Sequence, residues 1–168
     1  GTFLKRAVSN ETTPLTRVNG KGILYVADSG KHITLIELRN EAVYVNGNDL
    51  LAFEPSIAFE VKMIRRVVGM MAGGLFCVKL TGAGVVAISS HGEPTTLQTS
   101  PAQPLSTDPN ATIAWSGNLT PELKMDTSFK TLMGRGGGET FQMIFRGDGF
   151  VVIQPFEEMP TMTGQARP

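Results

Sequence analysis

Hydrophobic and polar residues alternate along much of this chain. In the segments 76–80 and 141–145 every second residue is apolar. A period of two puts one face of a β-strand against a core and leaves the other face toward solvent. No segment keeps an apolar period of 3.6 residues over the length of a helix,. The pattern therefore predicts an all-β protein.

Glycine (19 residues) and proline (10 residues) separate these runs along the whole length of the chain,. We expect the two Gly-x-Gly elements, Gly82 to Gly84 and Gly147 to Gly149, to be hairpin corners, because each lies between two apolar runs where a tight turn needs a positive φ. The predicted strands are Ile23–Ala27, Ile33–Leu38, Glu41–Val45, Leu50–Glu54, Ile57–Arg65, Leu75–Thr81, Gly84–Ser89, Thr95–Gln98, Ala111–Ser116, Leu119–Asp126, Glu139–Phe145 and Phe150–Pro155.

An internal repeat appears when the chain is compared with itself. One set of residues recurs 62 positions later (48 to 110), and a second set recurs 65 positions later (73 to 138). A phrase of one glycine and five mostly apolar residues occurs three times, from Gly22, Gly84 and Gly149. The first set matches Asn48, Ala52, Phe53, Ile57, Glu60, Lys62 and Met63 with Asn110, Ala114, Trp115, Leu119, Glu122, Lys124 and Met125. The second matches Gly73, Phe76, Val78, Leu80, Gly82 and Gly84 with Gly138, Phe141, Met143, Phe145, Gly147 and Gly149.

We interpret the repeat as a duplicated β unit, with copies at roughly 22–83 and 84–155. Neither copy could bury its apolar face alone, so we expect them to pack as the two sheets of a β-sandwich with pseudo-twofold symmetry. The prediction is one domain over residues 1–156. A flexible tail rich in Pro, Thr and Gly is expected at 157–168,.

Charge and cysteine content exclude several classes of protein. Fifteen basic and fifteen acidic residues give a net charge of zero, so the general attraction to phosphate that a DNA-binding protein uses is missing. A single cysteine, Cys77, excludes an internal disulfide framework and a cysteine-rich zinc site,. The sequence holds no apolar run long enough for a membrane span and no signal-peptide profile. We expect a cytoplasmic protein, with peripheral membrane association left open.

Residues that could carry chemistry do not form a catalytic set. The histidines are His32 and His91, and a metal site at His91 and Glu93 would lack further ligands of the usual spacing,. Ser89 is not in a nucleophile elbow, and Cys77 alternates with apolar residues, which favours packing. We predict no enzyme activity, no cofactor and no metal.

The basic residues Arg65, Arg66 and Arg135 are candidate anion contacts, because a guanidinium binds a phosphate or a carboxylate through two donors,. Aromatic residues do not interleave with them, so a stacking platform for RNA is not indicated.

A different kind of contact is predicted at residues 67–75, a stretch with no charged residue. Methionines beside glycines make an adaptable surface, so Met70, Met71 and Leu75 are candidate subunit contacts. Replacing Met70 and Met71 with aspartate should then dissociate the assembly and leave the subunit folded.

Four blocks of sequence resemble the AIM24 family, formerly a domain of unknown function. The resemblance implies a fold similar to the tryptophan RNA-binding attenuation protein superfamily, a double-stranded β-helix built by duplication, and it implies no catalytic residue or ligand. Fungal members of the family are mitochondrial, so a fungal source would imply that compartment. Likeness of fold does not transfer RNA binding. The blocks are 80–93, 108–117, 128–139 and 149–155.

Three hypotheses follow from these patterns. The first is a non-enzymatic β module that self-associates into a trimer or ring and acts as a scaffold or interaction platform for other proteins. The second is a small-ligand or RNA-binding module with an inter-subunit groove. The third and weakest is a cupin-like metalloenzyme around His91 and Glu93.

Overall fold

A computed structural model describes residues 15–64, 75–126 and 140–157 of the chain. Within these residues it contains strands and no helix, which confirms the all-β prediction. The described part accordingly holds no helix that could cross a membrane. The strands are β1 (His32–Asn46), β2 (Leu50–Phe53), β3 (Ala58–Ile64), β4 (Leu75–Ser90), β5 (Thr95–Thr99), β6 (Leu105–Thr107), β7 (Thr112–Ser116), β8 (Glu122–Asp126), β9 (Thr140–Phe145) and β10 (Gly149–Ile153).

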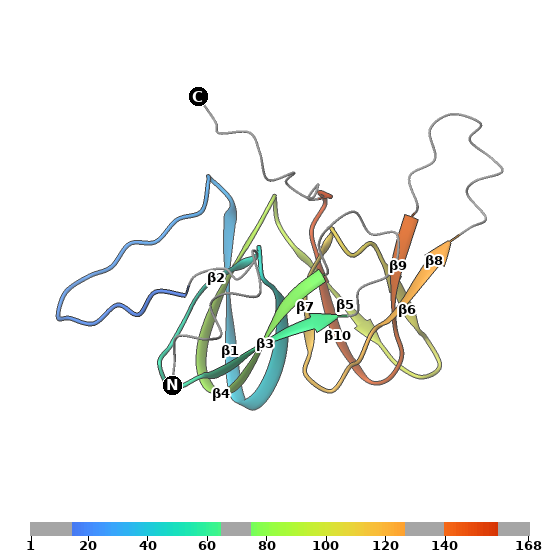
Figure 1. The fold of residues 1–168 in the computed structure, drawn as a ribbon, viewed down its shortest axis with the longest axis horizontal. Helices are drawn as coiled ribbons and strands as arrows, with labels where there is room; N and C mark the ends of the chain where they lie inside the picture. The colour runs from blue at the N-terminus through green and yellow to red at the C-terminus, as the bar shows by residue number, and fades with distance from the viewer. Residues whose placement is uncertain (1–14, 65–74, 127–139, 158–168) are drawn as a thin grey trace, which may run out of the picture.

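The strands form two antiparallel sheets. In the larger sheet the order is β2-β4-β1-β7-β10-β5, with β3 also paired to β4. The smaller sheet has the order β6-β9-β8. In Figure 1, β1 to β4 gather on one side of the molecule, while β6, β8 and β9 lie on the other side.

Two long strands, β1 and β4, pair along almost their whole length, from His32 opposite Ser90 to Asn46 opposite Cys77. Both bend near the middle. In β4 the bend falls at Gly82 and Gly84, whose φ angles are 134° and 149°. In β1 it falls at Asn40, where φ is 61° and the register shifts. The prediction of a hairpin corner at Gly82 to Gly84 is therefore wrong, because the glycines bend a continuing strand instead of reversing it.

The second Gly-x-Gly element is not a hairpin corner either. The strand before it, β9, pairs with β6 and β8. The strand after it, β10, pairs with β5 and β7. Gly147, with φ of 118°, thus stands where the chain passes from the smaller sheet to the larger one.

Three strand pairings correspond in the two halves of the chain when the sequence offsets of 62 and 65 are applied, and the pairing of β5 with β10 differs by one residue from that of the first half of β1 with β4. The pair Val43 and Leu80 becomes Leu105 and Phe145. Pairing of β2 with β4 matches pairing of β7 with β10, including the register shift. Pairing of β3 with β4 matches pairing of β8 with β9. We call residues 32–90 the first unit and residues 95–154 the second unit.

The two units are joined within one sheet. Val43, Tyr44 and Val45 of β1 pair with Ser116, Trp115 and Ala114 of β7. The expectation that each copy forms its own sheet of a sandwich is therefore wrong, because the larger sheet takes strands from both units.

The junction between the units is tight. The backbone N–H of Gly117 donates to the carbonyl of Ala42 at 2.8 Å. A Cβ atom on Gly117 would lie only 2.6 Å from that carbonyl oxygen. This approach of two backbones requires a glycine.

Buried apolar residues form two clusters, one centred on each unit. Corresponding positions of the two units are buried in corresponding clusters. The first cluster contains Ile57, Val78, Leu80 and Val86. Their counterparts Leu119, Met143, Phe145 and Val151 lie in the second. Trp115 of the second cluster stacks on Tyr44 of the first unit, with ring centroids 5.4 Å apart, so the second core reaches across the junction.

Residues 23–27, predicted as a strand, form no strand in the structure. The side chains of Ile23 and Tyr25 are 82% and 87% exposed. The segment is apolar, but no strand within the described residues pairs with it.

Candidate functional site

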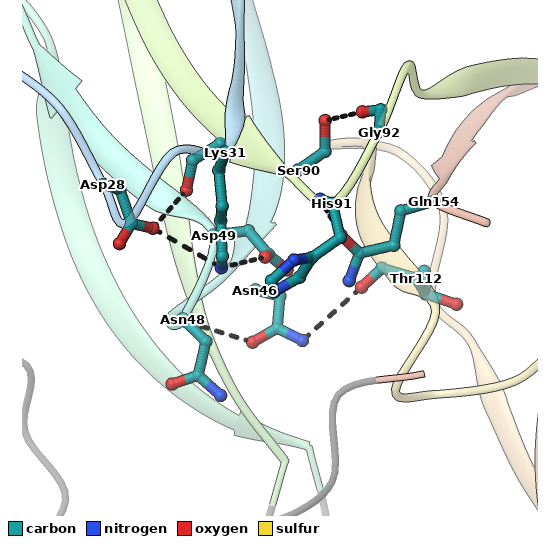
Figure 2. A network of polar contacts seen from close by, with 11 residues as sticks. Asp28, Lys31, Asn46, Asn48, Asp49, Ser90, His91, Gly92, Thr112 and Gln154 are labelled. Carbon is teal, nitrogen blue, oxygen red and sulfur yellow. Dashed lines mark hydrogen bonds and ion pairs between the residues drawn. The ribbon is translucent and has the colours of Figure 1, made fainter. Parts of the chain in front are cut away.

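A buried carboxylate, that of Asp49, is the centre of a polar network between β1 and β2. Asp49 follows the turn after β1 and is 1% exposed. The ammonium of Lys31 lies 3.6 Å from its Oδ1 and 3.4 Å from Oδ2 of Asp28. One cation thus serves two carboxylates, and Figure 2 shows it between them. Charges this deep need such pairing, because an isolated buried charge is costly.

Ser89, near the end of β4, connects this cluster to the strand through hydrogen bonds. Its hydroxyl donates to Oδ2 of Asp28 at 2.8 Å, and its backbone N–H donates to the carbonyl of Asp49. The hydrogen bond from Ser89 is the main cause that lowers the pKa of Asp28, and the charge of Lys31 lowers it further against the opposing effect of burial,. Asp28 is therefore an ionised acceptor at neutral pH.

Asn46, the last residue of β1, extends the network toward the second unit. Its side-chain oxygen accepts from the backbone N–H of Asn48 at 3.2 Å. Its side-chain amide donates to the carbonyl of Thr112 at 3.5 Å. Asn46 therefore holds the turn that positions Asp49 and contacts the first residue of β7.

His91 lies at the end of the same network (Figure 2). Its backbone N–H donates to Oε1 of Gln154, and its ring lies against the ring of Phe156 at 4.3 Å between centroids. The hydroxyl of Ser90 donates to the carbonyl of Gly92. The contacts are those of a polar turn, as predicted. Within the described residues no three His, Cys, Asp or Glu side chains are placed to share a metal ion.

This arrangement is suited to holding loops together. A carboxylate whose pKa is lowered, as in Asp28, is a weak general base at neutral pH. Lys31 is held beside two carboxylates, those of Asp28 and Asp49. The cluster therefore fixes the loop at 28–31 and the turn at 46–49 against the end of β4.

Cys77 is fully buried in β4, in the cluster centred on the second unit. Burial raises the pKa of its thiol to about 12, partly opposed by the charge of Lys62. A thiol in this state is neither an ionised nucleophile nor a ready metal ligand. The predicted packing role agrees with this placement.

The residues predicted as contact sites fall largely elsewhere. Met70, Met71 and the anion candidates Arg65, Arg66 and Arg135 lie outside the described residues. Leu75 is the first residue of β4 and pairs with Ile64. These predictions stay predictions.

Sequence reasoning missed the cluster around Asp49, although the repeat contained a signal for it. At the offset of 62, Asp49 corresponds to Ala111, and at 65, Ser89 corresponds to Gln154. Equivalent backbone hydrogen bonds join both pairs, at 2.8 Å for Ser89 to Asp49 and 2.9 Å for Gln154 to Ala111. The available signal was a charged residue, Asp49, at a position where the second repeat has an alanine.

Three comparisons with known proteins complete the description. The family model for mitochondrial biogenesis AIM24 matches residues 1–156. A Streptococcus pyogenes protein, solved by X-ray crystallography as a structural genomics target, is similar in fold with a TM-score of 0.60 and 24% identity. That match covers 75% of this chain and 55% of the other, so the chain spans about half the length of that relative. No curated protein matches the chain.

Proposed function

The chain belongs to the mitochondrial biogenesis AIM24 family, and from that premise we propose that it is a non-enzymatic, duplicated β module. Copies self-associate into a trimer or a closed ring and serve as a scaffold for other proteins. The matched strand pairings of the two units support the duplication.

One observation carries the proposal: an apolar stripe on β3 that is open to solvent. Phe59, Val61 and Met63 are 52%, 47% and 49% exposed. They stand opposite Leu80, Val78 and Phe76 of β4, and directly opposed residues of an antiparallel pair share one face of the sheet. The stripe therefore lies on the face that carries Leu80 and Val78 into the first core. Contiguous exposed apolar side chains mark interaction surfaces.

The second unit shows the same face in a covered state. At the offset of 62, Val61 corresponds to Leu123, which is partly buried and packs on the second core. Phe59 corresponds to Pro121, which is also partly buried. We assign the cover of the first unit's stripe to a second copy of the chain. Zero net charge favours this occupant, because copies then approach without overall repulsion,.

The absence of catalysis is part of the proposal and rests on the state of the reactive groups. The pKa of Cys77 is raised by burial and that of Asp28 is lowered by Ser89. The Cys77 thiol is therefore a weak nucleophile at neutral pH, and the Asp28 carboxylate is a weak general base.

The test is the mass of the protein in solution when the stripe is made acidic. Val61 and Met63 are both exchanged for aspartate, and light scattering after gel filtration measures the mass. We expect the wild type to be a trimer or ring and the double variant to be a monomer with an unchanged far-ultraviolet circular dichroism spectrum, because two buried carboxylates would have to lose their water.

Leu35→Asp is the matched control, since Leu35 of β1 is 67% exposed and lies outside the stripe. This variant should keep the mass of the wild type. A monomeric wild type, or a double variant that keeps the full mass, would contradict the assignment.

The ligand-binding alternative relies on Arg65, Arg66 and Arg135, which lie outside the described residues, so no contact in the structure favours it. The compartment expected from the sequence, the cytoplasm or the mitochondrion of a fungal source, stays a prediction.

A further inference from the structure

Residues 15–28 contain an apolar run, 23–27, and have no strand partner among the described residues. Leu24 and Val26 are 63% and 48% exposed, in addition to Ile23 and Tyr25. A stretch of four consecutive exposed apolar residues is costly in water and is rare on the surface of a folded protein.

The same segment is a third copy of the strand that closes each unit. At the offset of 62, Gly20 and Gly22 correspond to Gly82 and Gly84 of β4. The backbone agrees at one of the two glycines, since φ is 156° at Gly22 and 149° at Gly84, whereas φ is positive at Gly82 and not at Gly20. The glycine spacing of a closing strand and one of its two backbone angles are thus present in residues 20–22.

The counterparts of these exposed residues are deeply buried. Leu24 corresponds to Val86 and Val26 to Ile88, which are 0% and 1% exposed in β4. In the second unit the closing strand is β10, where Val151 is 0% exposed. The half of β4 that follows Gly84 is paired on one edge with β1 and on the other with β2, and β10 is paired in the same way with β5 and β7.

Two strands, β2 and β6, each have one edge without a partner among the described strands. The first unit joins the second by pairing the end of β1 with β7. The strand of the second unit that corresponds to the end of β1 is β6, which pairs only with β9 among the described strands. The strand of the first unit that corresponds to β7 is β2, which pairs only with β4. Among the described strands, one edge of each kind therefore has no partner. Pro55 takes the place of Gly117 beside β2, so a junction there would have one hydrogen bond fewer.

We propose that residues 15–28 are the closing strand of a third β unit, which precedes the first unit in the natural polypeptide. This unit covers Leu24 and Val26 with its own strands, and it joins the free edges of β2 and β6 in the way that β1 and β7 join each other. The proposal is independent of self-association through β3.

Hydrogen exchange measured by mass spectrometry tests this inference on two proteins, the 168-residue chain and the natural polypeptide from its own initiator methionine. In the short chain, amides of residues 22–28 should exchange like those of an unstructured peptide. In the natural polypeptide they should exchange at least roughly a hundredfold more slowly, because paired strands open rarely. The peptide 149–154 of β10 is the internal control and should be protected in both proteins.

A variant pair sharpens the test. Leu24→Asp should lower the melting temperature of the natural polypeptide and leave that of the short chain unchanged, because only the former buries Leu24. Lys21→Asp is the control, since its counterpart Ala83 is exposed in β4, and it should leave both melting temperatures unchanged.

Three results would overturn the proposal. One is a natural polypeptide that starts within a few residues of Gly1, and another is one that leaves 22–28 unprotected. The third is protection of 22–28 in the short chain that grows with protein concentration, which would assign the segment to a second copy. Loss of mass in the β3 variant alone would bear only on self-association.

Discussion

The first and second units share a backbone plan and differ in what fills it. Both pair their strands in matching registers, and both keep the same turn hydrogen bonds, such as Ile57 to Glu54 and Leu119 to Ser116 at 3.0 Å. The first unit has a buried ionic cluster at Asp49 and an open stripe on β3. The second unit has Ala111 and a covered face at the same positions.

This difference separates the features that the two units share from those in which they differ. Backbone contacts tolerate many side chains, so the same strand pairing can hold two different sequences. A buried ion pair or an exposed apolar stripe is costly unless it has a partner or a use. The departures between the units are therefore the places where stability and interaction can be tested most directly.

The largest effect is expected at the junction that joins the units. Gly117→Ala would put a Cβ atom 2.6 Å from the carbonyl oxygen of Ala42. Overpacking costs about 1–3 kcal/mol of unfolding free energy, and a contact this short with backbone should lie at the upper end of that range, which urea denaturation would measure. Gly20→Ala is the control, because a Cβ there meets no atom within 4 Å, and it should change stability by less than about 0.5 kcal/mol. Equal stability of the two variants would show that the junction is not tight.

The second-largest effect is expected from a substitution that makes the first unit resemble the second. Asp49→Ala removes one of the two carboxylates beside Lys31 and should cost about 1–3 kcal/mol, since removing one member of a buried pair leaves the other inadequately compensated. Adding Lys31→Met should recover most of that loss, because an apolar pair fits a site where the second unit has alanine. Urea denaturation of the four proteins in this cycle gives the coupling. Purely additive losses would contradict the ion pair.

The smallest effect concerns pH and also belongs to the first unit alone. The pKa of Asp28 is lowered chiefly by Ser89, so this carboxylate stabilises the fold above its ordinary value of 3.8 and loses that contribution as the pH falls through the lower folded value,. Ser89→Ala should raise the pKa of Asp28 toward 3.8 in a carboxyl titration followed by NMR. Ser90→Ala is the control, because its hydroxyl donates to Gly92. A shift of equal size in both variants would remove the assigned cause.

Much of the fold could be predicted from the sequence, because alternation of apolar residues reports burial directly. Strands such as β2, β7 and β10 were predicted within a residue or two at most ends. The three-residue strand β6 was missed, since so short a run has no readable period. The paths at Gly82 and Gly147 were predicted wrongly, because a positive φ suits a bend or a sheet crossing as well as a hairpin.

The candidate site was harder to predict than the fold. Asp28, Lys31 and Asp49 are separated by turns, and only the folded chain brings them to one cation. No period of the sequence encodes that meeting. The comparison of the repeats at Asp49 and Ala111 was the available clue, because a shared backbone frame makes a changed side chain conspicuous.

The bend that keeps β4 continuous has a consequence for how the molecule comes apart. In the first unit the two halves of β4 pair with β3 and with β2 within one continuous sheet, so strain applied to one half passes directly into the other. In the second unit the crossing at Gly147 separates the smaller sheet from the larger one. We expect the first unit to resist pulling and digestion as a single block, and the β6-β9-β8 sheet to be the piece that peels away first.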